Sequence, residues 1–155
     1  MMRFATGFLF VALMALGQQN HRDMVNEHGD HEMGFSHQKT THHFELNYDG
    51  GVIDVRANDV RDVASRDQIR GHFEHIAKMF AAGNFNVPML VHSTAVPGTA
   101  TMSRLKDQLH WTLTKTARGS RLTVIADNQI AREAVYEFLR FQINDHETGD
   151  CPMVR

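Results

Sequence analysis

The sequence predicts an α+β domain with a tandem ββα–ββα order, which forms an antiparallel sheet with two main helices packed on one face. Two stretches alternate apolar and polar residues, and a glycine-containing turn interrupts each of them. A stretch with helical periodicity follows each of these hairpins. With 155 residues, 22% of them charged and 42% hydrophobic, the chain suits one globular domain with its own core.

The first hairpin is expected over residues 40–57. Phe44 and Leu46 alternate with polar neighbours, and the glycines of the segment 48–51 tolerate the positive φ that a tight turn needs. His42 falls on the same side of its strand as the two apolar residues. We therefore expect His42 on the face of the sheet that the helices cover.

The first helix is expected from residue 67 to about residue 82. Ser65 and Gln68 fit a capping box before it, and Gly83 is the expected C′ residue after it. Its apolar residues recur at the i, i+4, i+7 and i+11 positions that make one buried stripe, namely Ile69, Phe73, Ile76 and Phe80.

The second half of the chain repeats this order after an irregular connection. Pro88 suggests that residues 89–92 form a short edge strand, and residues 102–109 are expected to form a short helix. Residues 110–125 show the alternation of a second hairpin. A helix over residues 129–143 then completes the second ββα unit.

The first 17 residues look like a signal peptide. Arg3 supplies the positive start, residues 4–16 form an apolar run too short to span a bilayer, and small residues precede a cut after Gly17. The expected location is therefore periplasmic or secreted, with no stable membrane anchor. A buried amino-terminal helix or an uncleaved anchor is the alternative.

Two terminal segments are expected to lie outside the folded domain, which covers residues 40–150. Residues 18–39 are polar, rich in His and Met, and without helix or strand period, so we expect a flexible arm. The arm either wraps a metal ion or serves as a solubilising linker. Residues 151–155 are expected to form a disordered tail. The one cysteine, Cys151, lies in this tail as an incidental residue, a free thiol or a site for an intermolecular disulfide.

A transition-metal site is the main functional expectation. The chain has 11 His and 9 Met, and its lone Cys excludes a Cys-based zinc site. The expected ligands from the first helix, one strand and the connection are His72, His75, Met79, His42 and His92. Imidazole without thiolate suits zinc, copper or nickel, and added thioether favours copper, so copper or zinc is expected. The alternative is that these imidazoles are helix-edge residues bonded to water or carboxylates.

Several other functions receive less support. A net charge of −2 argues against general nucleic-acid binding, and no G-x-S-x-G motif is present. A metal-dependent hydrolase would need three ligands and a general base, for which Glu45 and Glu74 are available without any marked spacing. The remaining alternative is an interaction module whose polar sheet face binds a protein partner or a second copy of the chain.

Five sequence blocks resemble a group of uncharacterised exported bacterial proteins over about residues 33–150. The blocks are MGF at 33–35, TTHHF at 40–44, RDQIR at 66–70, HIAKMF at 75–80 and FLRFQI at 138–143. The resemblance implies export and a shared fold, and it transfers no functional residue. The sequence as a whole therefore predicts an exported metal-binding protein that acts in buffering or delivery, and enzymatic activity is not expected.

Overall fold

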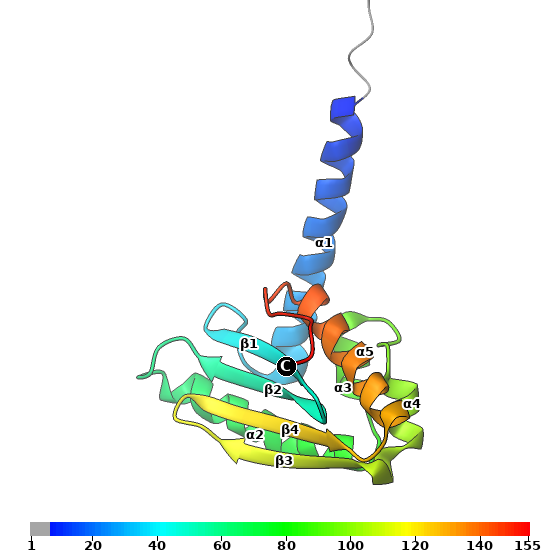
Figure 1. Ribbon diagram of the computed structural model, residues 1–155. Helices are drawn as coiled ribbons and strands as arrows, with labels where there is room; N and C mark the ends of the chain where they lie inside the picture. Colours follow the sequence, from blue (N-terminus) through cyan, green and yellow to red (C-terminus); the bar gives the residue numbers. More distant parts are fainter. Residues whose placement is uncertain (1–6) are drawn as a thin grey trace, which may run out of the picture.

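The computed structural model describes residues 7–155, with side chains from residue 17 onward. Within this range, five α-helices and one 3-10 helix accompany a single four-stranded sheet (Figure 1). The elements that carry the sheet and its cover are β1 Thr40–Asn47, β2 Gly50–Ala57, α2 Val63–Ala81, β3 Leu109–Lys115, β4 Gly119–Ala126 and α5 Gln129–Asp145. The predicted α+β class and the ββα–ββα order are confirmed.

The sheet has the strand order β1-β2-β4-β3, and every neighbouring pair is antiparallel. The two predicted hairpins therefore lie side by side, with the return strands β2 and β4 in the centre. His42 stands opposite Val55 in the register of β1 and β2. Side chains at alternate positions share a face, so His42 lies on the same apolar face as Phe44.

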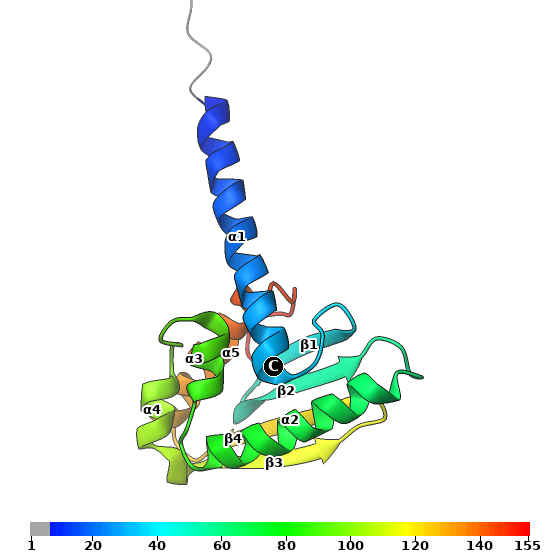
Figure 2. The ribbon, with the colours of Figure 1, turned by 180° about the vertical axis from the view of Figure 1, so that it is seen from behind.

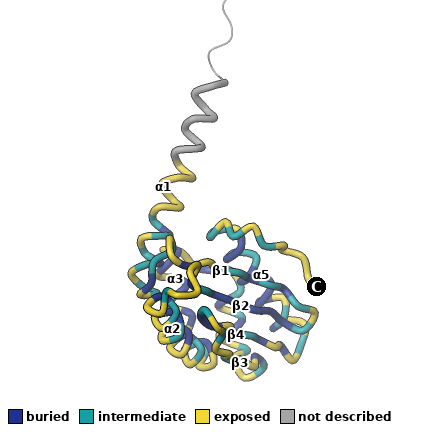
Figure 3. Tube along the Cα trace, turned by 90° about the vertical axis from the view of Figure 1, so that its left-hand side faces the viewer, coloured by how far each residue is buried: buried dark blue, intermediate teal, exposed yellow. Residues whose placement is uncertain are grey.

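Both long helices cover this apolar face. The predicted stripe of α2 is buried throughout, and Figure 2 shows α2 lying across the sheet. Helix α5 crosses close above β2: a Cβ on Gly51 would lie 2.2 Å from the side chain of Leu139. The buried positions gather between the two layers, as Figure 3 shows, which places the hydrophobic core there.

Helix α2 begins earlier than the sequence indicates. Asp62 is its N-cap, and its carboxylate accepts hydrogen bonds from the backbone N–H and the hydroxyl of Ser65, at 3.0 and 2.8 Å. The predicted capping box at Ser65 is therefore wrong. In that box Gln68 would accept from the N–H of Ser65, but Asp62, three residues before Ser65, already accepts from this N–H. At the other end Gly83 has φ of 77°, as expected of a C′ glycine.

The connection between the halves is helical. Residues 86–92 form α3 (Asn86–His92), followed by α4 (Thr99–Arg104) and a 3-10 turn, η1 (Lys106–Gln108). The predicted edge strand over residues 89–92 is wrong. Pro88 falls in the first turn of α3, where a missing N–H leaves no intrahelical hydrogen bond unmade, so the proline starts a helix here instead of limiting a strand.

The segment predicted to be a flexible arm is helical as far as its last methionine. Helix α1 (Gly7–Met33) stands away from the domain at its amino-terminal end and docks through its carboxyl-terminal half (Figure 1). Val25 is 1% exposed, and α1 packs against α3. This tertiary contact stabilises the helix over residues 18–33, where the polar sequence shows no helical period. Asp30 near the end of α1 accepts a hydrogen bond from the backbone N–H of His37, which positions the segment that leads to β1.

The predicted signal peptide lies partly outside the described residues. Residues 1–6 and the side chains up to residue 16 are not described, so the signal peptide stays a prediction. No helix formed by the described residues has the length and apolar character needed to cross a bilayer.

The tail after residue 150 follows the free edge of β1. The N–H of Arg155 donates to the Leu46 carbonyl at 2.9 Å, and the N–H of Tyr48 donates to the Arg155 carbonyl at 3.1 Å. The carboxylate of Asp150 accepts from the N–H of Phe44 at 2.9 Å. The expectation of a disordered tail is therefore wrong, because the segment supplies partners to an otherwise open strand edge.

Candidate metal centre

Four imidazoles from separate segments line one cavity of about 60 Å³ beneath α1. They are His42 on β1, His72 on α2, His92 at the end of α3 and His146 at the C-cap of α5. We call this cavity the histidine pocket. Its other walls are mostly apolar and include Met33, the last residue of α1. Three of the five predicted ligands therefore meet, and His146 joins them.

His42 and His146 form the closest parallel pair in the pocket. Their ring centroids lie 5.4 Å apart with an angle of 2° between the planes. The His42 ring also stacks against Phe35 at 5.9 Å and against Phe44 at 6.4 Å. The Nε2 atom of His42 is buried, and no described residue forms a hydrogen bond to it. An unpaired polar atom in such surroundings costs free energy unless a ligand or water completes it.

Burial keeps this pair neutral. Burial and the neighbouring His72 and His43 lower the pKa of His42 to about 4. Burial, together with His42 and His92, lowers the pKa of His146 to about 3. At neutral pH both rings therefore carry a lone pair, which is the form that binds a metal ion.

His72 forms the α2 side of the histidine pocket. Its ring meets Phe35 edge-on, with centroids 5.7 Å apart and an angle of 82° between the planes. Burial lowers the pKa of His72 to about 4, and the adjacent His75 adds to this effect. Positive charges on His72 and His42 would repel each other, so a proton on either ring disfavours a proton on the other.

His92 is held by a carboxylate. Its Nδ1–H donates to the carboxylate of Asp145, and its Nε2 lies 3.1 Å from Gln142 Oε1, an oxygen that can only accept a hydrogen bond. His21 of α1 contacts the same carboxylate at 2.9 Å. Burial would raise the pKa of Asp145, but the hydrogen bonds from His21 and His92 hold it below its ordinary value. His92 is therefore fixed by Asp145 and forms one wall of the pocket.

His75 and Met79 are not among the residues that line the histidine pocket. His75 is exposed, and Met79 packs against the hydrophobic core. Three helical residues turn the chain by about 300°, so His75 points about 60° away from the direction of His72. Met79 regains that direction about two turns further along α2, roughly 10 Å from His72.

A second, polar cavity of about 310 Å³ reaches the same pair from the other side. It shares Met33, His42 and His146 with the histidine pocket. Its remaining lining carries hydroxyl, amide, imidazole and carboxylate groups, from Asn26, His37, Thr40, Thr41, Glu147 and Thr148 among others. The pair therefore lines both an apolar cavity and a polar one.

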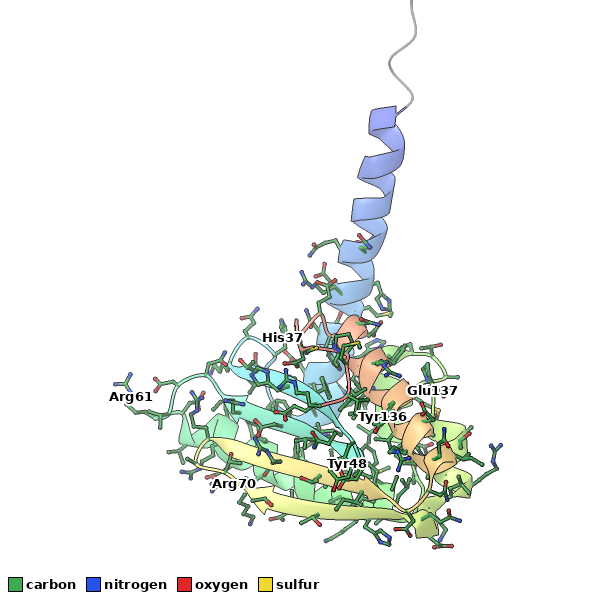
Figure 4. All side chains as sticks on the ribbon, viewed as in Figure 1. His37, Tyr48, Arg61, Arg70, Tyr136 and Glu137 are labelled. Atoms are coloured by element: carbon green, nitrogen blue, oxygen red, sulfur yellow. The ribbon has the colours of Figure 1, made fainter. Side chains whose placement is uncertain are left out.

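His37 is the best-oriented imidazole of this polar cavity. Its Nδ1–H donates to the carboxylate of Asp30 at 3.0 Å, and its backbone N–H donates to the same group at 2.7 Å. Figure 4 shows His37 at the base of α1, beside β1. A carboxylate on Nδ1 orients an imidazole so that its Nε2 can act as a ligand.

The sequence did not mark His37 or His146 as site residues. His37 belongs to the segment expected to be an arm, and His146 lies beyond the expected end of the last helix at residue 143. Their convergence depends on where α1, α3 and α5 end in space, which no local spacing encodes. Among residues 17–155, no three side chains of His, Cys, Asp or Glu are already arranged as ligands of one ion.

Comparisons with protein-family models, with curated proteins and with solved structures gave no match to this chain. The fold and the histidine pocket therefore carry the functional argument alone.

Proposed function

We propose that the protein binds a transition-metal ion at His42 and His146 and acts outside the cytoplasm in metal buffering or delivery. The observation that carries the proposal is the buried, unpartnered Nε2 of His42 in a cavity that three further imidazoles line. Export is supported by the charged and apolar start of the sequence, with Arg3 followed by the run 4–16.

The low pKa values favour metal over protons. A ligand must lose its proton before it binds a metal ion, so a high pKa makes proton and metal compete. The pKa of His42 is about 4 and that of His146 is about 3. Competition from protons is therefore weak at neutral pH, and affinity should fall only in acid.

The geometry restricts how the pair can share an ion. A metal lies in the plane of an imidazole that binds it, about 2.0–2.1 Å from the nitrogen for zinc. Two rings in parallel planes can share one ion only when the planes coincide, with the ion in a nearly linear site. Otherwise one ring must rotate. Since His146 follows the last turn of α5 whereas His42 lies within strand β1, the His146 ring is the more adaptable of the two.

The pocket favours cuprous copper over zinc. Its described lining contains the thioether of Met33 and no carboxylate. Soft thioether ligands favour Cu(I), and a monovalent ion costs less to bury among apolar groups than a divalent one. Zinc would need to recruit donors from the polar cavity, where His37 and Glu147 are available.

Anaerobic competition titrations of Cu(I), and parallel titrations of Zn(II), test the proposal. His42→Ala and His146→Ala should each weaken binding by at least about tenfold, which corresponds to ~1.4 kcal/mol. His110→Ala is the matched control, because His110 is exposed and pairs with Asp127 at 2.8 Å on the far strand. Equal affinities of all three variants would overturn the site, and an absence of binding to the wild-type protein would overturn the function.

The interaction-module alternative retains one supporting observation. Arg56, Arg121 and the exposed Ile125 lie on the sheet face opposite α2 and α5. The side chains of Arg121 and Ile125 are exposed there, which leaves them accessible to a partner. For a hydrolase, the described lining of the histidine pocket provides no carboxylate as a general base.

A further inference from the structure

Three arginines surround one depression on the sheet face turned away from α2 and α5. The depression has a volume of about 210 Å³, and its lining includes Arg56 of β2, Arg121 of β4 and Arg118 of the β3–β4 turn. We call it the arginine depression. It lies on the opposite face of the sheet from the histidine pocket, so it is independent of the proposed metal site.

Asp54 forms the floor of the arginine depression and fixes two of the arginines. Asp54 is 3% exposed and stands opposite Arg121 in the strand register. Its carboxylate accepts from Nε of Arg56 at 3.2 Å and from Nε of Arg121 at 3.0 Å. The Nη2 atoms of Arg56 and Arg121 lie within ion-pair distance of the same carboxylate, at 3.1 and 3.0 Å. Each of these guanidinium groups keeps its Nη1 donors free of hydrogen bonds to described residues.

Arg118 is held in place through its turn. The backbone carbonyl of Arg118 accepts from the N–H of Ala57 at 2.8 Å, and its Nη1 donates to the Asn58 carbonyl at 3.3 Å. Arg70 of α2, labelled in Figure 4, donates to the carbonyls of Thr116 and Gly119 and so anchors both ends of the turn. A fixed turn places the third guanidinium with little loss of conformational entropy on binding.

The charges in the depression do not cancel. Three guanidinium groups and one carboxylate leave an excess of two positive charges, and Asp54 is the one carboxylate of the described chain within salt-bridge distance of these arginines. Guanidinium groups present rigid forks of donors that match the oxygens of phosphate. We propose that the arginine depression binds a doubly charged oxyanion, either inorganic phosphate or the phosphate group of a small molecule.

Titration calorimetry at neutral pH and low salt tests this proposal with inorganic phosphate, glycerol phosphate and acetate. Either phosphate compound should bind at least about tenfold more tightly than acetate, because one negative charge leaves half of the excess unmatched. Tighter binding of glycerol phosphate would identify the phosphate group of a small molecule as the ligand, and tighter binding of inorganic phosphate would identify the free ion. Equal binding of all three anions, or none, would overturn the proposal.

Two variants with a matched control locate the site. Arg118→Gln should weaken phosphate binding by about tenfold. Arg61→Gln should leave it unchanged, because Arg61 is exposed and pairs with Asp59 at 3.1 Å outside the depression. Asp54→Asn should strengthen phosphate binding, since it removes the internal competitor for two guanidinium groups. A similar loss in both arginine variants would indicate diffuse surface charge and overturn the proposal. Should Asp54→Asn fail to fold, the arginine comparison decides alone.

Discussion

Acidifying the metal-free protein from about pH 7 to about pH 5 is expected to lower its free energy of unfolding. The pKa of His42 and of His72 is lowered to about 4, and that of His146 to about 3, chiefly by burial. In the unfolded chain these imidazoles return to an ordinary value of 6.5. The unfolded state therefore binds protons first as the pH falls.

The sign and size follow from proton linkage. Stability is complete above the unfolded-state value of 6.5 and is lost as the pH falls toward the folded-state values. One imidazole that takes its proton only after unfolding lowers the free energy of unfolding by (6.5 − 5) × ~1.36, or roughly 2 kcal/mol, at about pH 5. Three such groups set an upper limit of ~6 kcal/mol, against a typical net stability of about 5–15 kcal/mol for a domain.

Urea denaturation at several values between about pH 7 and about pH 5 measures this loss. The chain has a single tryptophan, and Trp111 packs against Phe80 and Phe85 with ring centroids 5.2 and 6.4 Å apart. Its fluorescence therefore reports on unfolding of the core. Few carboxylates titrate above about pH 5, so this window isolates the imidazoles.

Two substitutions identify the imidazoles responsible. His42→Phe keeps an aromatic ring against Phe35 and Phe44 but removes one titrating group, so the pH slope should fall by about one proton. The slope should not change in His110→Phe, since His110 is exposed on β3. A wild-type stability that stays constant down to about pH 5 would refute the reasoning from burial.

Four further substitutions test the packing of the fold. Gly98→Ala should cost more than about 2 kcal/mol, because residue 98 has φ of 80° and a Cβ there would lie 2.1 Å from a backbone oxygen of α5. Gly71→Ala on the open side of α2, where a Cβ meets nothing within 4 Å, should instead stabilise by roughly 0.5–1 kcal/mol; chemical denaturation measures both, and equal effects would contradict the argument. Phe80→Ala should cost ~3–5 kcal/mol because the side chain is 2% exposed, and an unchanged urea midpoint would contradict this. Asp150→Ala should cost about 1–3 kcal/mol and speed hydrogen exchange at the Phe44 amide, whereas unchanged exchange would mean that the tail does not protect β1.

Local patterns were sufficient to predict the sheet and its two covering helices. The stripe from Ile69 to Phe80 is buried as its spacing requires, and the alternation around Phe44 placed His42 on the covered face. Both inferences depend only on how often apolar side chains recur along a single helix or strand that has one buried side. That is why they needed no knowledge of the rest of the fold.

The elements that were missed depend on contacts between distant segments. The part of α1 after residue 17 has a polar sequence, and its docking depends on Val25 and on pairs such as His21 with Asp145, which is far along the chain. α3 was obscured because Pro88 limits a strand interior but is tolerated in the first turn of a helix. Errors in these two elements hid the convergence at His146.

The position of the histidine pocket at three helix ends supports a cation as its ligand. Met33 is the last residue of α1, His92 the last of α3, and His146 caps α5, and all three line the same cavity. The carbonyl ends of helices carry partial negative charge, which favours cations. Burial nevertheless excludes protons from His42 and His146 near neutral pH. A metal ion would differ from a proton here because it would gain several donors at once, so it would offset the desolvation that a single proton on one ring cannot.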